Sequence, residues 1–208
     1  MINHLRRLIA ATVIFLACSS SAVAQEPRRI DIAGGYASLW SPDHLWADEG
    51  LNWIRGSAFV TEVPPPFKLG WFLSAAPRAT PWLAVVGEMS RTTTNFFPEE
   101  GSEGATSIDL TVLSFMGGPR FIARHNRAEV FSQVLFGAHR LRADAAPSRM
   151  FRTAQTGSTT NLATQPGGGV DVYALDNLAV RFAVNLRWVN WVETRTETQI
   201  VAGVVYSR

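Results

Sequence analysis

The side chains that could carry out covalent chemistry centre on the histidines, because nucleophilic catalysis commonly pairs a His with a Ser and an acidic group. Beyond residue 24 there are three: His44, His125 and His139. Only His139 lies within a long strand-like segment, and its neighbours Ala138, Arg140 and Leu141 form no His-x-Ser pair. We therefore interpret His139 as a hydrogen-bonded structural residue and predict no catalytic residues and no enzymatic activity.

Metal and cofactor sites are not predicted either. The only cysteine, Cys18, lies in an N-terminal segment that we expect to be removed, so the mature chain has no disulfide and no cysteine metal site. Gly167 to Gly169 could suggest a phosphate-binding loop, but they precede a strand-like segment and lack a Lys-Ser/Thr partner. We interpret this triplet as a place of tight backbone packing.

The N-terminal segment has the pattern of a Sec-type signal peptide. Arg6 and Arg7 precede an apolar run from Leu8 to Cys18, and Ala22-Val23-Ala24 forms a small-x-small cleavage site. This run is too short to cross a bilayer as a helix, which needs about 20 residues. The prediction is a signal peptide over residues 1–24 and a mature domain over 25–208. A lipoprotein signal at Cys18 is the minor alternative.

The composition indicates one compact domain that does not bind nucleic acid. The chain has 208 residues, of which 47% are hydrophobic and 17% charged. The 19 Lys and Arg include Arg6 and Arg7, so the mature chain carries 17 of them against 17 Asp and Glu. A net charge near zero lacks the basic footprint of a nucleic-acid-binding protein.

The segment from Leu178 to Trp188 shows the clearest secondary-structure signal, a strict alternation with a period of two. One face is apolar: Leu178, Val180, Phe182, Val184, Leu186 and Trp188. The other face carries Ala179, Arg181, Ala183, Asn185 and Arg187. Such alternation predicts a strand with one oily face and one charged face.

Similar patterns bounded by turn signals predict an all-β chain. The eight expected strands are Ile30–Trp40, Gly70–Arg78, Trp82–Thr92, Ile108–Ala123, Glu129–Arg142, Thr164–Ala174, Leu178–Trp188 and Thr198–Ser207. Short connections alternate with long ones: Ala79–Pro81, Arg124–Ala128 and Leu175–Asn177 are short, whereas Ser41–Leu69, Thr93–Ser107, Ala143–Ala163 and Val189–Glu197 are long. Transmembrane β-barrels have this asymmetry, with short periplasmic turns and long extracellular loops.

Two observations favour an apolar face that points outward to lipid. The polar face of Leu178–Trp188 combines long Arg side chains with small Ala, which suits the narrow interior of an eight-stranded barrel. Aromatic residues also gather near both predicted strand ends, as in the girdles of membrane barrels: Trp40, Trp71, Trp188 and Trp191 at one end, and Trp82, Phe121 and Tyr206 at the other. The predicted fold is an eight-stranded antiparallel up-and-down transmembrane β-barrel.

The register of two neighbouring strands predicts a specific ion pair. With Leu175–Asn177 as a three-residue turn, paired residue numbers sum to 352, and Asp171 lies opposite Arg181 on the inner face. A buried charge is costly unless it is paired, so we expect contact between them, shared with Glu88. The predicted interior polar network comprises Asp171, Arg181, Glu88, Asn185 and Arg187.

The sequence resembles the small bacterial outer-membrane β-barrel domain family, the OmpA/OmpX-like barrels. The segments that carry the resemblance are Asp31–Tyr36, Trp82–Glu88, Gly117–Phe121, Phe136–Ala138 and Gly167–Asp171. Of the family's C-terminal assembly signal, Gly203 and Tyr206 are in place, whereas Arg208 stands where an aromatic residue is expected. The resemblance implies a Gram-negative outer-membrane location and assembly by the barrel-insertion machinery.

The predicted function is a non-enzymatic structural or surface-interaction role of a monomeric barrel. Its expected partners are outer-membrane lipid and lipopolysaccharide, whose phosphates Arg140, Arg142, Arg149 and Arg152 could reach. Two alternatives stay open. One is a periplasmic or secreted lipocalin-like binder of a small apolar ligand, with its apolar face turned inward, and the other is a lipid A-modifying barrel enzyme.

Overall fold

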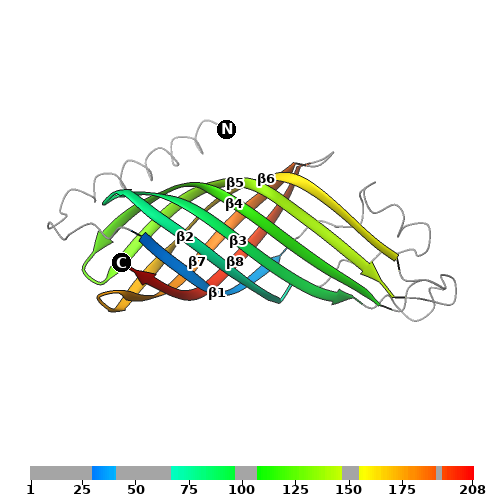
Figure 1. The fold of residues 1–208 in the computed structure, drawn as a ribbon, viewed down its shortest axis with the longest axis horizontal. Coiled ribbons are helices and arrows are strands. Elements are labelled where there is room, and N and C mark those ends of the chain that lie inside the picture. The colour runs from blue at the N-terminus through cyan, green and yellow to red at the C-terminus, as the bar shows by residue number, and fades with distance from the viewer. Residues whose placement is uncertain (1–29, 41–66, 97–106, 147–154, 191–193) are drawn as a thin grey trace, which may run out of the picture.

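The computed structural model describes residues 30–40, 67–96, 107–146, 155–190 and 194–208, which form a closed barrel with its strands in chain order (Figure 1). Every neighbouring pair is antiparallel, including β1 with β8. The strands are β1 (Ile30–Trp40), β2 (Leu69–Thr80), β3 (Leu83–Phe96), β4 (Ile108–His125), β5 (Ala128–Ala145), β6 (Gln155–Leu175), β7 (Leu178–Asn190) and β8 (Thr194–Ser207). In the part of the chain described, no helix is long and apolar enough to cross a membrane.

The faces of the barrel confirm the predicted orientation. Along β7 exposed and buried residues alternate without interruption, and its outward side chains from Leu178 to Leu186 are each between 36% and 56% exposed. Closure pairs the backbone groups of both edges, so an apolar outer wall can face hydrocarbon without unsatisfied main-chain groups. A lipocalin-like barrel would bury these five side chains in its interior, which is the opposite of what is seen.

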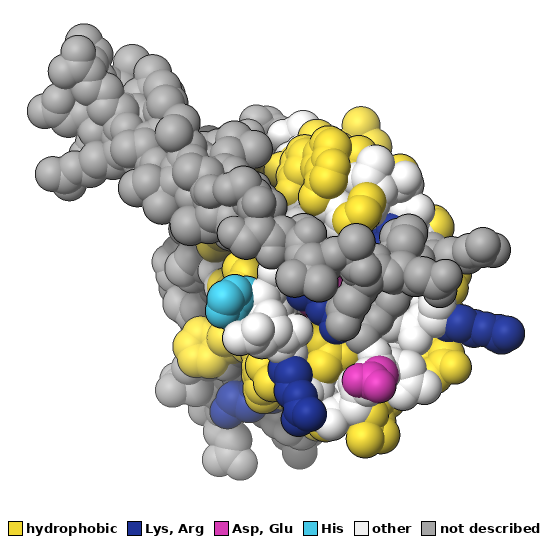
Figure 2. All heavy atoms as spheres, turned by 90° about the vertical axis from the view of Figure 1, so that its left-hand side faces the viewer, with side chains coloured by type: hydrophobic (Ala, Val, Ile, Leu, Met, Phe, Trp, Pro, Cys, Tyr) yellow, Lys and Arg dark blue, Asp and Glu magenta, His cyan; other side chains and the backbone are white. Residues whose placement is uncertain are grey.

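The first described residue, Ile30, exchanges backbone hydrogen bonds with Arg208 at the end of the barrel that carries the short turns (Figure 1). At the other end the prediction of a long loop Val189–Glu197 is wrong, because β7 extends to Asn190 and β8 begins at Thr194. The short turns are tighter than predicted, at two residues each: 81–82, 126–127 and 176–177. Asn126 has a φ of 52°, in the left-handed region that Asn tolerates better than most residues. Viewed from this end, hydrophobic side chains are gathered around the circumference (Figure 2).

The predicted turn Leu175–Asn177 is wrong in length, but the predicted register is correct. Leu175 pairs directly with Leu178, and an irregularity between Tyr173 and Leu175 restores the predicted offset. From Tyr173 back toward the start of β6, the residue numbers of each β6–β7 pair sum to 352, as for Val172 opposite Val180. A bulge thus absorbs the extra residue and keeps inward and outward side chains on their own faces.

Exposed aromatic side chains lie at both ends of the apolar band. Trp40, Trp71 and Trp188 point outward near the long-loop end, while Trp191 lies outside the described residues. At the other end Trp82 stands in a turn and stacks on Phe121, with ring centroids 6.4 Å apart. The two groups fit the aromatic girdles of a transmembrane barrel.

The largest difference from the predicted elements is β6, which begins at Gln155 rather than at Thr164. Its first residues are polar on both faces, so they carry no alternation that the sequence could have revealed. As a result the connection between β5 and β6 is much shorter than the predicted loop Ala143–Ala163. The strands β4, β5 and β6 continue past the apolar band.

In this extension the polarity of the two faces is reversed. Ile108, Leu110 and Val112 of β4 point inward and are buried, whereas Asp109 points outward. On β5 the outward side chains past the band are Arg140, Arg142 and Asp144. A sheet that leaves the bilayer meets water on its outer side, so the oily face moves inward as in a soluble protein.

We expect Phe182→Arg to destabilise the barrel by about 2 to 4 kcal/mol in lipid, because an outward charge near the bilayer midplane must be desolvated. Unfolding titrations in phospholipid vesicles measure this difference, with Phe182→Leu as the apolar control. Equal stability of the two variants would contradict the assignment of this face to lipid.

Candidate functional site

The interior of the barrel is filled by charged and amide side chains that form hydrogen-bonded layers. In the layer nearest the short turns, Arg78 of β2 donates to Asp31 of β1 and to Glu129 of β5, each at 2.7 Å. Tyr173 of β6 donates to Glu129 at 3.2 Å. The Arg78 guanidinium therefore joins β1, β2 and β5, and the hydrogen bond from Tyr173 to Glu129 adds β6 to this layer.

The middle layer contains the predicted ion pair. Arg181 donates from Nε and Nη2 to the two oxygens of Asp171, at 2.8 and 2.7 Å, so the contact is bidentate. Both side chains are nearly fully buried, and Asp171 lies directly opposite Arg181 in the ladder. Glu88 was expected to share this pair, but the third partner of Arg181 is the Ser74 hydroxyl, at 3.4 Å.

A second guanidinium in this layer has no carboxylate partner among its hydrogen bonds. Arg120 donates twice to the Gln133 side-chain oxygen, at 2.9 and 2.7 Å, and its Nη1 lacks a partner. Its guanidinium lies 4.4 Å from the centroid of Phe131, and that of Arg181 lies 4.9 Å from the same ring. Cation–π contacts of this kind stabilise a cation away from water.

The layer toward the long-loop end centres on Arg187 of β7. Arg187 donates to the Gln165 side-chain oxygen at 2.8 and 2.7 Å and to the Ser114 hydroxyl at 2.9 Å. Glu197 lies 3.8 Å from Arg187, and Glu88 accepts a hydrogen bond from Gln165 at 3.2 Å. A chain of amide side chains starts from Gln133 in the middle layer: Gln133 donates to Asn185, Asn185 to Gln199, and Gln199 to Ser90.

The five residues of the predicted interior network are thus all buried, although they belong to two layers rather than one cluster. Sequence reasoning missed the other members of the network, among them Arg78, Arg120, Glu129, Gln165 and Glu197. Strand parity is the signal that could have found them, because each shares the inward face of its strand. The Gly167–Gly169 triplet is a packing feature, since a Cβ at Gly167 would overlap the Asn185 side chain.

The structure brings Ser114 and His139 together, a pairing that the sequence analysis did not anticipate. They lie directly opposite on β4 and β5, and His139 Nε2 is 3.7 Å from Glu197. However, the Ser114 hydroxyl bonds to Arg187, and His139 Nδ1 also faces Arg187, at 3.4 Å. With both groups bonded to a guanidinium in the buried lumen, the arrangement does not form a base and nucleophile pair.

Outside the apolar band, Arg140 and Arg142 both point outward from β5. Arg140 donates to Ser158 of β6 at 3.2 Å, and Arg142 donates to Asp144 at 2.8 and 3.0 Å. The bonds from Arg142 and Thr156 hold the pKa of Asp144 below its ordinary value. Arg149 and Arg152, predicted for the same role, lie outside the described residues.

One further cation belongs to the same surface and was missed from sequence. Arg91 of β3 points outward and lies opposite Leu113 of β4, which in turn lies opposite Arg140. Arg91 and Arg140 are the first charged residues met on the outward faces of their strands above the apolar band. Within the described residues Arg91 forms no ion pair.

A closed antiparallel barrel of eight strands, with an apolar outer wall and hydrogen-bonded charged side chains inside, defines a transmembrane β-barrel of the smallest kind. This is the fold of the small outer-membrane barrels. No family model and no curated protein sequence matches the chain.

Solved structures support the fold independently. The outer-membrane protein Ail of Yersinia pestis, crystallised in complex with the heparin analogue sucrose octasulfate, aligns with a TM-score of 0.56 and 20% identity over 88% of this chain and 99% of its own. Neisserial surface protein A aligns with a TM-score of 0.54 and 14% identity over 86% of this chain and 96% of its own. At these identities the likeness concerns the fold.

The buried pair generates a stability prediction. We expect Arg181→Met to lower the free energy of unfolding by about 3 to 5 kcal/mol, because the Asp171 carboxylate then stays buried without its two guanidinium hydrogen bonds. Adding Asp171→Leu removes the unpaired charge and should recover part of that loss. Urea titrations in vesicles compare the variants, and a double variant no more stable than Arg181→Met would contradict a direct pair.

Proposed function

We propose that the protein is a monomeric outer-membrane β-barrel of a Gram-negative bacterium with a non-enzymatic structural or surface-interaction role. In this proposal residues 1–24 are a Sec-type signal peptide, and the mature chain, beginning at Gln25, is inserted by the barrel-assembly machinery. The long-loop end then faces the cell exterior, and the short turns and both termini face the periplasm.

The observation that carries this proposal is the pairing of a charge-free outer band with a lumen filled by bonded side chains. The buried guanidinium groups of Arg187, Arg181 and Arg78 occupy the interior at successive levels, so the barrel offers no wide path for solutes. The same network argues against a lipocalin-like carrier, because an apolar ligand would have to displace paired charges. It also uses Ser114 and His139 structurally, which argues against a lipid A-modifying enzyme.

The proposed surface role rests on the outward-pointing residues of the barrel just beyond the apolar band. Arg140 and Arg142 stand just outside the apolar band at the long-loop end, where phosphates of lipopolysaccharide would lie. A guanidinium suits phosphate oxygens because its donors form a planar fork. The structurally similar protein Ail was crystallised with a sulfated sugar. For the present protein we propose lipopolysaccharide as the anionic partner.

Fractionation tests the location. We expect the mature protein to stay with outer membranes after a high-salt wash, to need detergent for release, and to migrate faster on a gel before boiling than after it. A closed barrel resists unfolding by the gel detergent until it is heated, which explains the shift. Release into the soluble periplasmic fraction without detergent would contradict the proposal.

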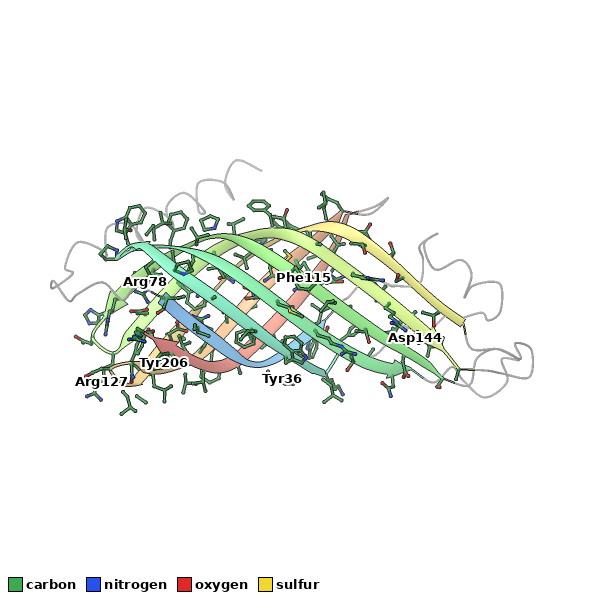
Figure 3. All side chains as sticks on the ribbon, in the orientation of Figure 1. Tyr36, Arg78, Phe115, Arg127, Asp144 and Tyr206 are labelled. Carbon is green, nitrogen blue, oxygen red and sulfur yellow. The ribbon has the colours of Figure 1, made fainter. Side chains whose placement is uncertain are left out.

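A matched charge comparison tests the lipopolysaccharide contacts. Arg140→Ser with Arg142→Ser should weaken lipopolysaccharide binding to the detergent-solubilised barrel by about tenfold at low salt. Arg127→Ser, an exposed change at the opposite end of the barrel from Asp144, is the control (Figure 3). Asp144→Asn should strengthen binding, because it releases Arg142 from its carboxylate partner. Equal losses in the Arg127 and double variants would contradict the proposed contacts.

A further inference from the structure

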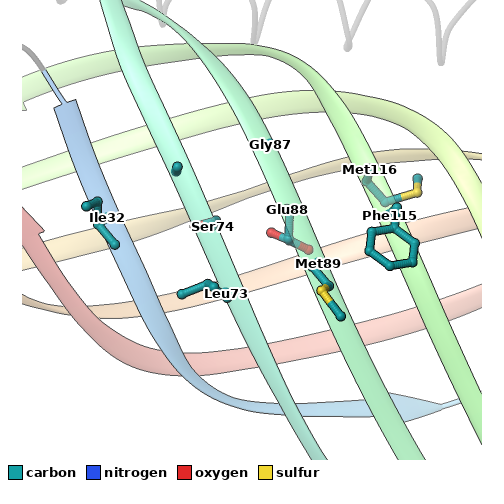
Figure 4. Close-up of a pocket in the computed structure, with 9 residues that line it drawn as sticks. Ile32, Leu73, Ser74, Gly87, Glu88, Met89, Phe115 and Met116 are labelled. Carbon is teal, nitrogen blue, oxygen red and sulfur yellow. The ribbon is translucent and has the colours of Figure 1, made fainter.

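The apolar outer wall is interrupted by a groove of about 600 Å³ on the lipid-facing side of β1 to β4 (Figure 4). Its outward-pointing lining residues are Ile32, Leu73, Ala75, Gly87, Met89 and Phe115. None of these six side chains is polar, and the inward-pointing Ser74, Glu88 and Met116, which also line the groove, are buried. The groove is continuous with the band that contacts lipid, so hydrocarbon is the medium that meets it.

The groove exists because one row across the sheet lacks side-chain volume. Ala75 of β2 lies opposite Gly87 of β3, and Gly87 lies opposite Gly117 of β4. Larger side chains end the row on both sides, Ile32 opposite Ala75 and Phe136 opposite Gly117. A Cβ added at Gly87 would meet no atom within 4 Å, so the space directly above the Gly87 backbone is empty.

Cations stand above this groove at the end of the apolar band. Arg91 lies on the same outward face of β3 as Gly87, four residues nearer the long loops, which is about 13 Å along a strand. Arg140 is two strands away in the same row, with its Cα about 10 Å from that of Arg91. A ligand with anionic groups at this level and a hydrocarbon chain below would satisfy both features.

We propose that this surface is a binding site for lipid A, with phosphates at Arg91 and Arg140 and one acyl chain lying in the groove over Gly87. The inference deepens the proposed function and rests on it, since it places lipopolysaccharide on a defined face of the barrel. A lipid with two phosphates on one headgroup can engage both cations, whereas a phospholipid with one phosphate engages only one. A second copy docked here about a two-fold axis would bring like charges together.

Two variants separate the parts of the site. Gly87→Phe fills the groove without a steric clash at Cβ, and Arg91→Gln removes the cation above it. Val184→Phe, which also places an outward Phe but on β7 at the opposite side of the barrel, is the control. Heat-modifiable gel migration verifies that each variant is folded.

Native mass spectrometry of the detergent-solubilised protein, incubated with bis-phosphorylated lipid A or with phosphatidylglycerol, measures the bound lipid. We expect lipid A to be retained at least about tenfold over phosphatidylglycerol, Arg91→Gln to reduce its binding about tenfold, and Gly87→Phe about fivefold. Val184→Phe should bind as the unchanged protein does.

Four results would overturn the proposed lipid A site. Equal retention of lipid A and phosphatidylglycerol would remove the headgroup assignment. Unchanged lipid A binding by Gly87→Phe would exclude the groove as the acyl-chain site. If the Arg140 and Arg142 double variant still lost binding in that case, the proposed function would stand while this inference failed. A dimer abolished by Gly87→Phe would assign the groove to a second copy. Loss of binding in none of the Arg variants would contradict both proposals.

Discussion

Hydrocarbon on the outer side of the β-strand wall forces the charged side chains of the membrane-spanning region to point into the barrel interior. There each charged group needs a hydrogen-bonding or ionic partner, because little water is present to solvate it. The consequences are visible at Glu129 and Asp171. These two carboxylates lie directly opposite each other on β5 and β6, and each is held by its own guanidinium, from Arg78 and Arg181 respectively. Strand register, barrel closure and charge placement are therefore one coupled arrangement, since a slip of one residue would expose these groups to lipid.

The same solvent argument explains the change of pattern along β4 and β5. Inside the apolar band polar residues point inward, and above it Ile108, Leu110 and Leu141 do so instead. The boundary falls where Arg140 replaces outward residues such as Phe136. Among the described residues of β3 to β5, charged side chains point outward from the long-loop end of the wall beyond this boundary, so a surface that could bind anionic groups begins there.

The sequence predicts this fold well where a strand spans the bilayer and poorly where it does not. Strict alternation in Leu178–Trp188 was sufficient to place both faces, and the register then gave the Asp171–Arg181 pair. The first third of β6 was missed because residues 155–161 are polar on both faces. Arg91 and Ser114 were missed because their roles depend on pairing across strands: Ser114 meets His139 only through the β4–β5 register, and Arg91 meets Arg140 only through two ladders.

The central claim is that alternate residues of one strand face lipid and a packed polar interior. A scan of nitroxide labels on single cysteines from Val180 to Arg187, in a Cys18→Ser background and in bilayers, measures collision with oxygen, which concentrates in hydrocarbon. The account predicts maxima at Val180, Phe182, Val184 and Leu186, with minima and immobile labels at the residues between them. Oxygen collision without a period of two, or with maxima at Arg181 and Asn185, would contradict it.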